Sequence, residues 1–463
     1  MMTRSVPAWL FALVVLALVI GAIFFGRMVM NAMHDPFRAT AIEKHARSVA
    51  AFPDLAHDTL KQISAAVTGP SGLATVGQPI GPDIGRKGFE PLPMAEGIGV
   101  VPPVFRADRD RLSRGWRMLY LKPPVEGEAV NAALLLDPDL RIVKFWRLSD
   151  TADDGVGPSP HPERARLVHG VEITRDGTLF YTFDGSPSMH RIDSCATRIW
   201  HARSPTGPYH HAITLSDDGE SLWTFVANRV GEFSTETGEE LRSIGPAKMW
   251  NASPDIDLLK LRMEHRNLTS TNDRNTTGRW LTREERFHFN DVDPLPSRLA
   301  PMFPMFEAGD LLISARELNL VYVIDPETFE TKWWRVGQWN RQHDPEWMAD
   351  GRIGVYDNRM SRDYSRIVAI DPVTYETEVL FDGRKVDFYS RIRGKLQVLE
   401  DGTLVTNSPQ QGRAFEVTPD GDVVLEIVNH NPGRENHALT ISEMRWFPPG
   451  HFTFDTWACP PAR

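Results

Sequence analysis

Cysteine is scarce in this sequence, because the 463 residues contain only Cys195 and Cys459. Two cysteines are too few for a disulfide-rich scaffold, and they lack the paired spacing of a structural zinc site. Two alternatives stay open for them. They form one long-range disulfide in an oxidising compartment, or they are two separate buried thiols.

An excess of basic charge is also missing. Lysine and arginine number 51 against 61 aspartate and glutamate residues, which gives a formal net charge of -10. A surface that binds nucleic acid normally needs clustered basic residues, so we expect no nucleic-acid partner. Hydrophobic residues at 41% and charged residues at 24% are typical of a globular protein and exclude a largely disordered chain.

Only one long apolar run occurs, over residues 8–26, where nineteen residues carry no charge. That length spans a bilayer as a helix. A cleaved signal peptide usually has a shorter apolar segment, and no small-x-small cleavage site precedes Arg27, so the sequence favours an uncleaved single-pass anchor. Arg4 on one side and Arg27 and Arg38 on the other leave its orientation open.

The rest of the chain divides by composition. We predict a membrane anchor over residues 1–30, then a short helical stalk over residues 31–66, where alanine, leucine and charged residues follow a loose helical spacing. Residues 68–103 are rich in glycine and proline and predict an extended linker. Stalk and linker together occupy residues 31–104, and the globular domain occupies residues 105–463.

Sustained helical patterns are absent from this globular domain. Short apolar or alternating runs separated by turn residues predict strands instead. The absence of intervening helices excludes a parallel α/β fold and favours an all-β architecture of repeated units. Examples of these runs are RMLYLKPP, GTLFYTFDG, ESLWTFVA, LVYVIDPETFETKWWRV, RIVAIDPVTYETEVLF and DVVLEIV.

Three segments share one sequence frame, with histidine at the first position and glycine at the ninth. They begin at His169, His211 and His343. Gly177 and Gly219 are 42 residues apart, as are Gly309 and Gly351, and Gly402 follows Gly351 by 51 residues. This spacing is typical of one four-stranded propeller blade and predicts a β-propeller of five to six blades. The interval from Gly219 to Gly309 is 90 residues and leaves room for a further blade or for an insertion near residues 245–285.

The innermost strand of each blade lines the axial channel of a propeller, so equivalent residues of different blades face the same channel. The three histidines of the frame are therefore expected in one cavity, together with His288, which precedes another predicted strand. Clustered imidazoles suit nucleophilic or acid–base chemistry near neutral pH. Structural histidines and metal ligands are the alternatives. We predict no metal, because carboxylates do not accompany the histidines at repeated positions.

Two further polar residues are candidates for this cavity. Arg316 follows the apolar run LLISA and could bind an anion, or it could form an ordinary salt bridge with Glu317. Asn290 lies two residues after His288 and is expected on the same face of a strand. A turn-forming asparagine is the alternative for this position.

An ordered series of motifs resembles the bacterial arylsulfate sulfotransferase family. It extends over roughly residues 165–445. Each motif is weak alone, and their order is what makes the resemblance specific. The series is Tyr209-His210-His211, then His288-Phe289-Asn290, then Ser314-Ala315-Arg316, then Gln342-His343-Asp344, then Asp357-Asn358, then Ser365-Arg366.

This resemblance implies a six-bladed propeller that moves a sulfuryl group from a phenolic sulfate ester to a phenol, without a nucleotide sulfate donor or any other cofactor. It implies that His343 is transiently sulfurylated in a ping-pong cycle. Supporting catalytic roles fall to His211, His288 and Arg316. Substrate-binding roles fall to Asn290, His210 and His169.

The anchor and the resemblance together predict a protein of the cytoplasmic membrane whose propeller lies in the periplasm. The expected partners are the donor ester, the acceptor phenol and the membrane, and the sequence names no protein partner. A propeller that binds an envelope partner without catalysis is one alternative, since this fold hosts many functions. A hydrolase of sulfate or phosphate esters is another.

Overall fold

The structure is a computed structural model that describes residues 8–34, 40–50, 84–149, 167–256, 287–360, 362–433, 437–453, 457 and 459. The chain forms two compact units, Met1–Ser71 and Gly72–Arg463, and each is described by itself. Part of the predicted stalk, residues 51–66, lies outside the described residues, as does much of the region between Gly219 and Gly309.

The described residues of the first unit form the helices α1 (Ala8–His34) and α2 (Ala41–Ala50). A capping box begins α2, because the Thr40 hydroxyl accepts from the Glu43 backbone N–H at 3.3 Å and a Glu43 carboxylate oxygen accepts from the Thr40 N–H at 2.8 Å. The predicted transmembrane helix is not supported. The segment is helical and continues through Arg27, but no described helix has the combined length and apolar character of a membrane span.

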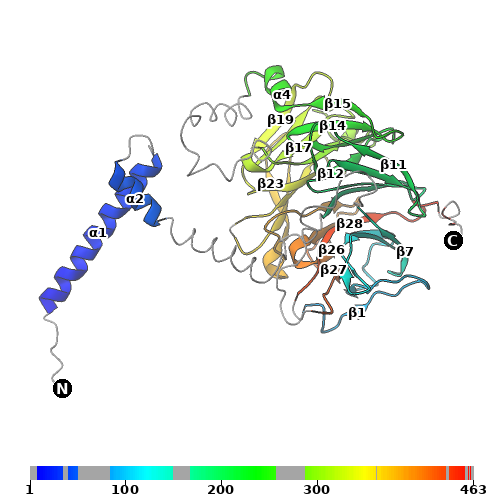
Figure 1. Ribbon diagram of the computed structural model, residues 1–463, viewed down its shortest axis with the longest axis horizontal. Helices are drawn as coiled ribbons and strands as arrows, with labels where there is room; N and C mark the ends of the chain where they lie inside the picture. Colours follow the sequence, from blue (N-terminus) through cyan, green and yellow to red (C-terminus); the bar gives the residue numbers. More distant parts are fainter. Residues whose placement is uncertain are drawn as a thin grey trace. The chain divides into compact units, whose positions relative to one another are not determined.

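The second unit is a six-bladed β-propeller, as predicted (Figure 1). Each blade is an antiparallel sheet whose first strand is innermost. Blade 1 contains β28 (Ile441–Phe447), β3 (Trp116–Leu121), β6 (Ala132–Leu136) and β7 (Ile142–Arg147). Blade 2 contains β8 (Val168–Ile173), β9 (Leu179–Phe183), β10 (Ser188–Ile192) and β11 (Arg198–Arg203). Blade 3 contains β12 (Tyr209–Leu215), β13 (Ser221–Val226), β14 (Arg229–Ser234) and β15 (Glu240–Ile244).

The remaining three blades continue the same order. Blade 4 contains β16 (Phe289–Pro294), β17 (Leu311–Ala315), β18 (Leu320–Ile324) and β19 (Thr331–Val336). Blade 5 contains β20 (His343–Trp347), β21 (Ile353–Asp357), β22 (Arg366–Ile370) and β23 (Thr377–Asp382). Blade 6 contains β24 (Leu396–Val398), β25 (Leu404–Ser408), β26 (Arg413–Val417) and β27 (Val423–Val428), and β2 (Val104–Ala107) and β1 (Glu90–Pro91) extend its outer edge.

Short elements connect these strands. They are the hairpin β4 (Pro124–Val125) and β5 (Glu128–Ala129), the helix α4 (Pro246–Ala252), and the 3-10 turns η2 (Ala300–Met302), η3 (Arg316–Leu318), η4 (Gly383–Lys385) and η5 (Pro409–Gln411). Within the described part of the chain, no sheet lies between blade 3 and blade 4. The long interval after Gly219 could hold a further blade or an insertion. Its described residues form no further blade and include the helix α4, which agrees with an insertion.

The core lies between the blades. The middle strands of each blade are buried on both faces, which explains why they appear in the sequence as continuous apolar runs. One hydrophobic cluster fills each of the six contacts between neighbouring blades. The cluster between blades 4 and 5, for example, contains Leu312, Val323, Trp347 and Val355. Each large side chain buried in this way contributes roughly 1.5–3 kcal/mol.

The end of the chain closes the ring. The last strand, β28, pairs with β3 near the start of the propeller, from Ile441 opposite Leu121 to Phe447 opposite Trp116. In Figure 1 the orange and red C-terminal strands lie beside the cyan strands that begin the propeller. A disulfide between Cys195, in the β10–β11 turn, and Cys459 then ties the C-terminal segment to blade 2. Of the two alternatives for the cysteines, the structure has the bridge.

We expect loss of this bridge to destabilise the propeller, because the disulfide closes a loop between residues 264 positions apart. Cys459→Ser should lower the free energy of unfolding by roughly 2–5 kcal/mol. Urea denaturation of the full chain with and without reductant measures this loss. Reductant should destabilise the wild type and leave Cys459→Ser unchanged. Equal stability of the oxidised wild type and the variant would contradict the expectation.

Candidate active site

A β-bulge marks the start of several inner strands. The pairing register of β12 with β13 shifts between His210 and Ile213, and that of β20 with β21 shifts between His343 and Glu346. The register of β16 with β17 shifts in the same way between Phe289 and Asp291. His211, within the first of these shifts, and His288, just before the last, adopt left-handed backbone conformations, with φ of 60° and 46°. Such conformations cost about 1–3 kcal/mol each and concentrate at functional sites. The bulges interrupt the strand alternation and re-aim the side chains that begin each inner strand.

The bulges bring the predicted histidines together. The ring centroid of His211 lies 4.3 Å from that of His169, 4.0 Å from His210, 4.9 Å from His288 and 5.4 Å from His343. His211 is thus the centre of a cluster of five imidazoles that come from blades 2, 3, 4 and 5. The geometry therefore brings the histidines of equivalent blade positions together, as their shared frame predicts.

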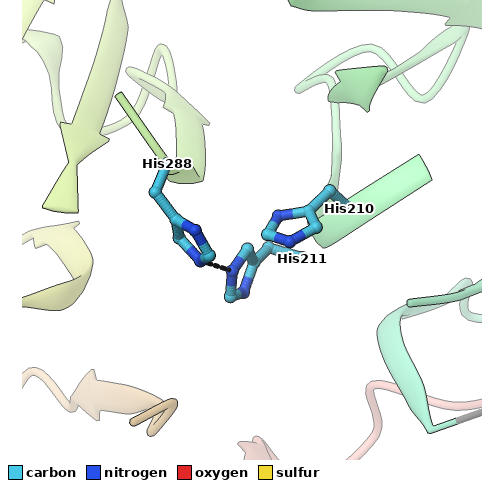
Figure 2. A group of neighbouring side chains, drawn as sticks. All are labelled: His210, His211 and His288. Carbon is cyan, nitrogen blue, oxygen red and sulfur yellow. Dashed lines mark hydrogen bonds between the residues drawn. The ribbon is translucent and has the colours of Figure 1, made fainter. Parts of the chain in front are cut away.

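A direct contact joins two of these rings. The Nε2 atoms of His211 and His288 lie 2.8 Å apart, so one ring donates its N–H and the other accepts. Figure 2 shows the two rings pointing toward each other, with His210 beside them. Both side chains are buried. The pair can therefore hold or pass a single proton.

Burial controls the protonation of the cluster. It lowers the pKa of His211, His288 and His343 well below the ordinary histidine value. The positive charge of Arg316 is the next largest cause for His288 and His343. These imidazoles are therefore neutral at neutral pH, which is the state in which a ring nitrogen is a nucleophile or a base.

Arg316 is held beside the cluster by its own backbone. Its N–H donates to the His288 carbonyl at 3.2 Å. Its guanidinium bonds a Glu317 carboxylate oxygen at 2.8 Å, and Arg341 bonds the same oxygen. The salt bridge to Glu317 that the sequence offered as an alternative is present. The charge of Arg316 nevertheless contributes, after burial, to the lowered pKa of His288 and His343.

Asn290 contacts the next blade. Its Nδ2 donates to the Gln342 carbonyl at 2.7 Å, immediately before His343, and its Oδ1 is buried without a hydrogen-bond partner. All seven predicted residues thus belong to one neighbourhood. The unpaired oxygen of Asn290 is an acceptor that a ligand hydroxyl could satisfy.

Three residues of the site, Asp184, Asn358 and Arg393, were not predicted to have a role. Asp184, in the turn after β9, lies 3.5 Å from His210 Nε2, 4.0 Å from His169 Nδ1 and 3.4 Å from the Arg393 guanidinium. Burial would raise the pKa of Asp184, but the imidazoles and Arg393 outweigh it and lower the pKa below its ordinary value. An anionic Asp184 therefore orients this side of the cluster.

His343 is held on both ring nitrogens. Its Nδ1 lies 2.6 Å from Asn358 Oδ1, and its Nε2 accepts from the Arg393 backbone N–H at 3.2 Å. A sequence signal for Arg393 was available. The frame that begins with histidine in blades 2, 3 and 5 recurs in blade 6, one residue longer, from Arg393 to Gly402. Arg393 thus occupies a place related to that of the histidines.

His210, His211 and His288 are also a possible metal-binding group, because one ring nitrogen of each lies within 4.8 Å of the others. Tetrahedral zinc sets its nitrogen ligands only about 3.3 Å apart. The Nε2 of His210 faces Asp184 instead. One imidazole must turn before these three residues could hold an ion.

A second polar layer, the lower layer, lies further along the inner strands, after the positions of the histidines, which form the upper layer. All six inner strands line a chamber of about 200 Å³ there. Lys395 bridges Asp291 at 3.0 Å and also bonds Asp344. The chamber is lined by five carboxylates, Glu172, Asp291, Asp293, Glu346 and Glu443, and three cationic residues, Arg298, Lys395 and Arg445.

A sequence model for the arylsulfotransferases (ASST) matches residues 170–430, which is more than half of the chain and includes nearly the whole site. The chain belongs to the arylsulfotransferase family. The matched residues include all of the motifs from Tyr209 to Arg366 on which the resemblance to the arylsulfotransferases rests. No curated protein sequence matches the chain.

Two solved structures align with this arylsulfotransferase-family chain at low sequence identity. A protein of unknown function from Bacteroides caccae is 13% identical, with a TM-score of 0.46 over 72% of this chain and 98% of that one. Virginiamycin B lyase from Staphylococcus aureus is 11% identical, with a TM-score of 0.36 over 61% of this chain and 84% of that one.

The chamber generates a prediction about stability. Burial, followed by the negative charges of Asp291 and Asp344, raises the pKa of Asp293 well above its ordinary value. Above about pH 4 the unfolded chain ionises this carboxyl while the folded chain keeps its proton, so rising pH favours unfolding. Asp293→Asn removes this penalty. Its Tm relative to wild type should rise between pH 5 and pH 8, and a difference independent of pH would contradict the assignment.

Proposed function

We propose that the chain is an aryl sulfotransferase that moves a sulfuryl group from a phenolic sulfate ester to a phenol through a sulfohistidine at His343. The observation that carries the proposal is the neutral, buried imidazole of His343 within a cluster that also contains a cation and a proton-sharing histidine pair. Family membership supports the activity at a general level.

In the first half-reaction, His343 Nε2 attacks the sulfur of the donor. The bond between sulfur and the aryl oxygen breaks, and its electron pair leaves with that oxygen. Arg316 offsets the negative charge of the sulfuryl oxygens, as a fixed cation does in an anion-stabilising site. The Arg393 N–H must leave Nε2, and its 3.2 Å bond is long enough to be weak.

The His211–His288 pair supplies the proton that the leaving phenolate needs. A bound sulfate ester brings a negative charge into the cluster and raises the pKa of nearby imidazoles. Donor binding therefore favours the protonated form of the His211–His288 pair, which can then donate its proton. In the second half-reaction the pair removes a proton from the acceptor phenol, whose oxygen attacks sulfur and releases neutral His343.

We also propose an oxidising compartment outside the cytoplasm for the propeller. The Cys195–Cys459 bond supports this location, because disulfides persist in such compartments and are rare in the cytosol. A periplasm satisfies this condition. Attachment of the chain to a membrane stays a prediction made from the sequence.

The first test mixes the full chain with 4-nitrophenyl sulfate. Rapid mixing should give a burst of nitrophenol equal to the enzyme present, and excess phenol should then sustain turnover. His343→Ala should abolish the burst, with a loss of at least about 10³-fold in turnover. His201→Ala, in the outer strand β11, is the control and should retain activity. Sustained release without phenol would favour a hydrolase, and no release would favour a binding propeller.

A second prediction concerns Arg316. Arg316→Ala should lower kcat/KM by about 10²-fold or more, because charge on the sulfuryl oxygens loses its fixed partner. Its loss also removes a cause of the low pKa of His343, so the acid limb of the pH–rate profile should move to higher pH. Arg341→Ala removes the other cation on Glu317 and serves as the control. An acid limb shared by Arg316→Ala and wild type would contradict this role.

A further inference from the structure

Asn358 lies directly behind His343 and makes three hydrogen bonds. It follows β21 and is completely buried. Its Nδ2 donates to the carbonyl of Ser390 at 2.9 Å and to the carbonyl of Arg393 at 2.6 Å. Its Oδ1 lies 2.6 Å from His343 Nδ1. No hydrogen-bonding atom of this side chain is left over.

These contacts determine which way the amide faces. Backbone carbonyls only accept hydrogen bonds, so the atom between Ser390 and Arg393 must be the NH₂ group. The oxygen of Asn358 therefore faces His343. An amide oxygen also only accepts, which means that His343 Nδ1 must carry a hydrogen.

The tautomer of His343 follows from this. A neutral imidazole carries one hydrogen, and if Nδ1 holds it, Nε2 has a lone pair. The opposite side of the ring agrees independently, because the Arg393 N–H donates to Nε2. Asn358 and Arg393 thus select the same tautomer from the two ends of the ring.

We propose that Asn358 is a positioning residue that fixes His343 as the Nδ1–H tautomer, so that Nε2 is the atom that accepts the sulfuryl group. The inference rests on the proposed function and assigns Asn358 a part in it. The other tautomer has its hydrogen on Nε2 and therefore has no lone pair on that atom with which to attack sulfur. Asn358 acts through His343 and need not touch the substrate.

The amide also differs from a carboxylate at this place. A carboxylate would stabilise the imidazolium form and raise the pKa of His343. The hydrogen bond from a neutral amide also raises the pKa of His343, but burial and Arg316 outweigh it and keep that pKa well below its ordinary value. The site therefore combines a fixed tautomer with an uncharged nucleophile.

The test compares two variants of Asn358 with a matched control. Asn407 is also completely buried, donates Nδ2 to the Ile441 carbonyl at 2.8 Å and accepts from the Lys395 N–H at 2.8 Å, but contacts no histidine. Asn358→Leu should lower kcat about 10- to 100-fold with little change in KM. Asn358→Asp should shift the acid limb of kcat/KM to higher pH, and Asn407→Asp should leave it in place.

A purely structural role would not move the pH profile. An acid limb shared by Asn358→Asp and wild type, or an equal shift in Asn407→Asp, would overturn the proposal. The first result would mean that the charge behind His343 does not reach the nucleophile, and the second that the shift does not depend on contact with the His343 ring.

A spectroscopic measurement separates this inference from the activity itself. Nitrogen-15 NMR of the full chain labelled at histidine, with His343 assigned by the loss of its signals in His343→Gln, should show a protonated Nδ1 and a bare Nε2. The opposite tautomer overturns the proposal. The expected tautomer in a chain that transfers no sulfuryl group would support control by Asn358 and count against sulfuryl transfer.

Discussion

The pairing of β28 with β3 is the interaction on which the rest of the structure depends. The histidine cluster draws its rings from four different blades, so its distances exist only when the ring of blades is closed. A buried ion pair between Arg117 in blade 1 and Glu416 in blade 6 lies at the same closure. Removing one partner of such a pair is strongly destabilising, because the other charge stays buried.

Closure also explains why two chemically opposed layers can coexist in one channel. The upper layer holds neutral imidazoles, and the lower layer holds carboxylates with Lys395 and Arg445. Both layers repeat along the inner strands, where His343 is followed by Asp344 and Glu346, and His169 by Glu172. Burial keeps a proton on Asp293 in the lower layer, as it keeps the imidazoles neutral in the upper one, so each layer carries less charge than its residue types suggest.

The fold was predictable because the same residue pattern recurs from blade to blade along the sequence. Histidine and glycine eight positions apart, in three blades, indicated both the blade and the residues that face the channel. The predicted site residues His169, His211 and His343 came from that frame. Asp184 and Asn358 could not be found in this way, because they lie in turns outside the repeated frame. The bulges were also invisible, since a left-handed His211 or His288 has no sequence signature. The apolar N-terminal run correctly predicted a helix, α1, but the membrane span that it also predicted is not supported in the described part of the chain.

The disulfide gives the closing strand a short tether. Cys459 lies twelve residues after the end of β28 at Phe447 and is fixed to blade 2. Terminal strands are ordinarily the first to fray. If β28 detaches here, it stays within the reach of a short segment, so its effective concentration at the open edge of β3 is in the millimolar range. Re-pairing within the same chain then outcompetes pairing with a strand of another molecule, and the open edge of blade 1 is protected against aggregation.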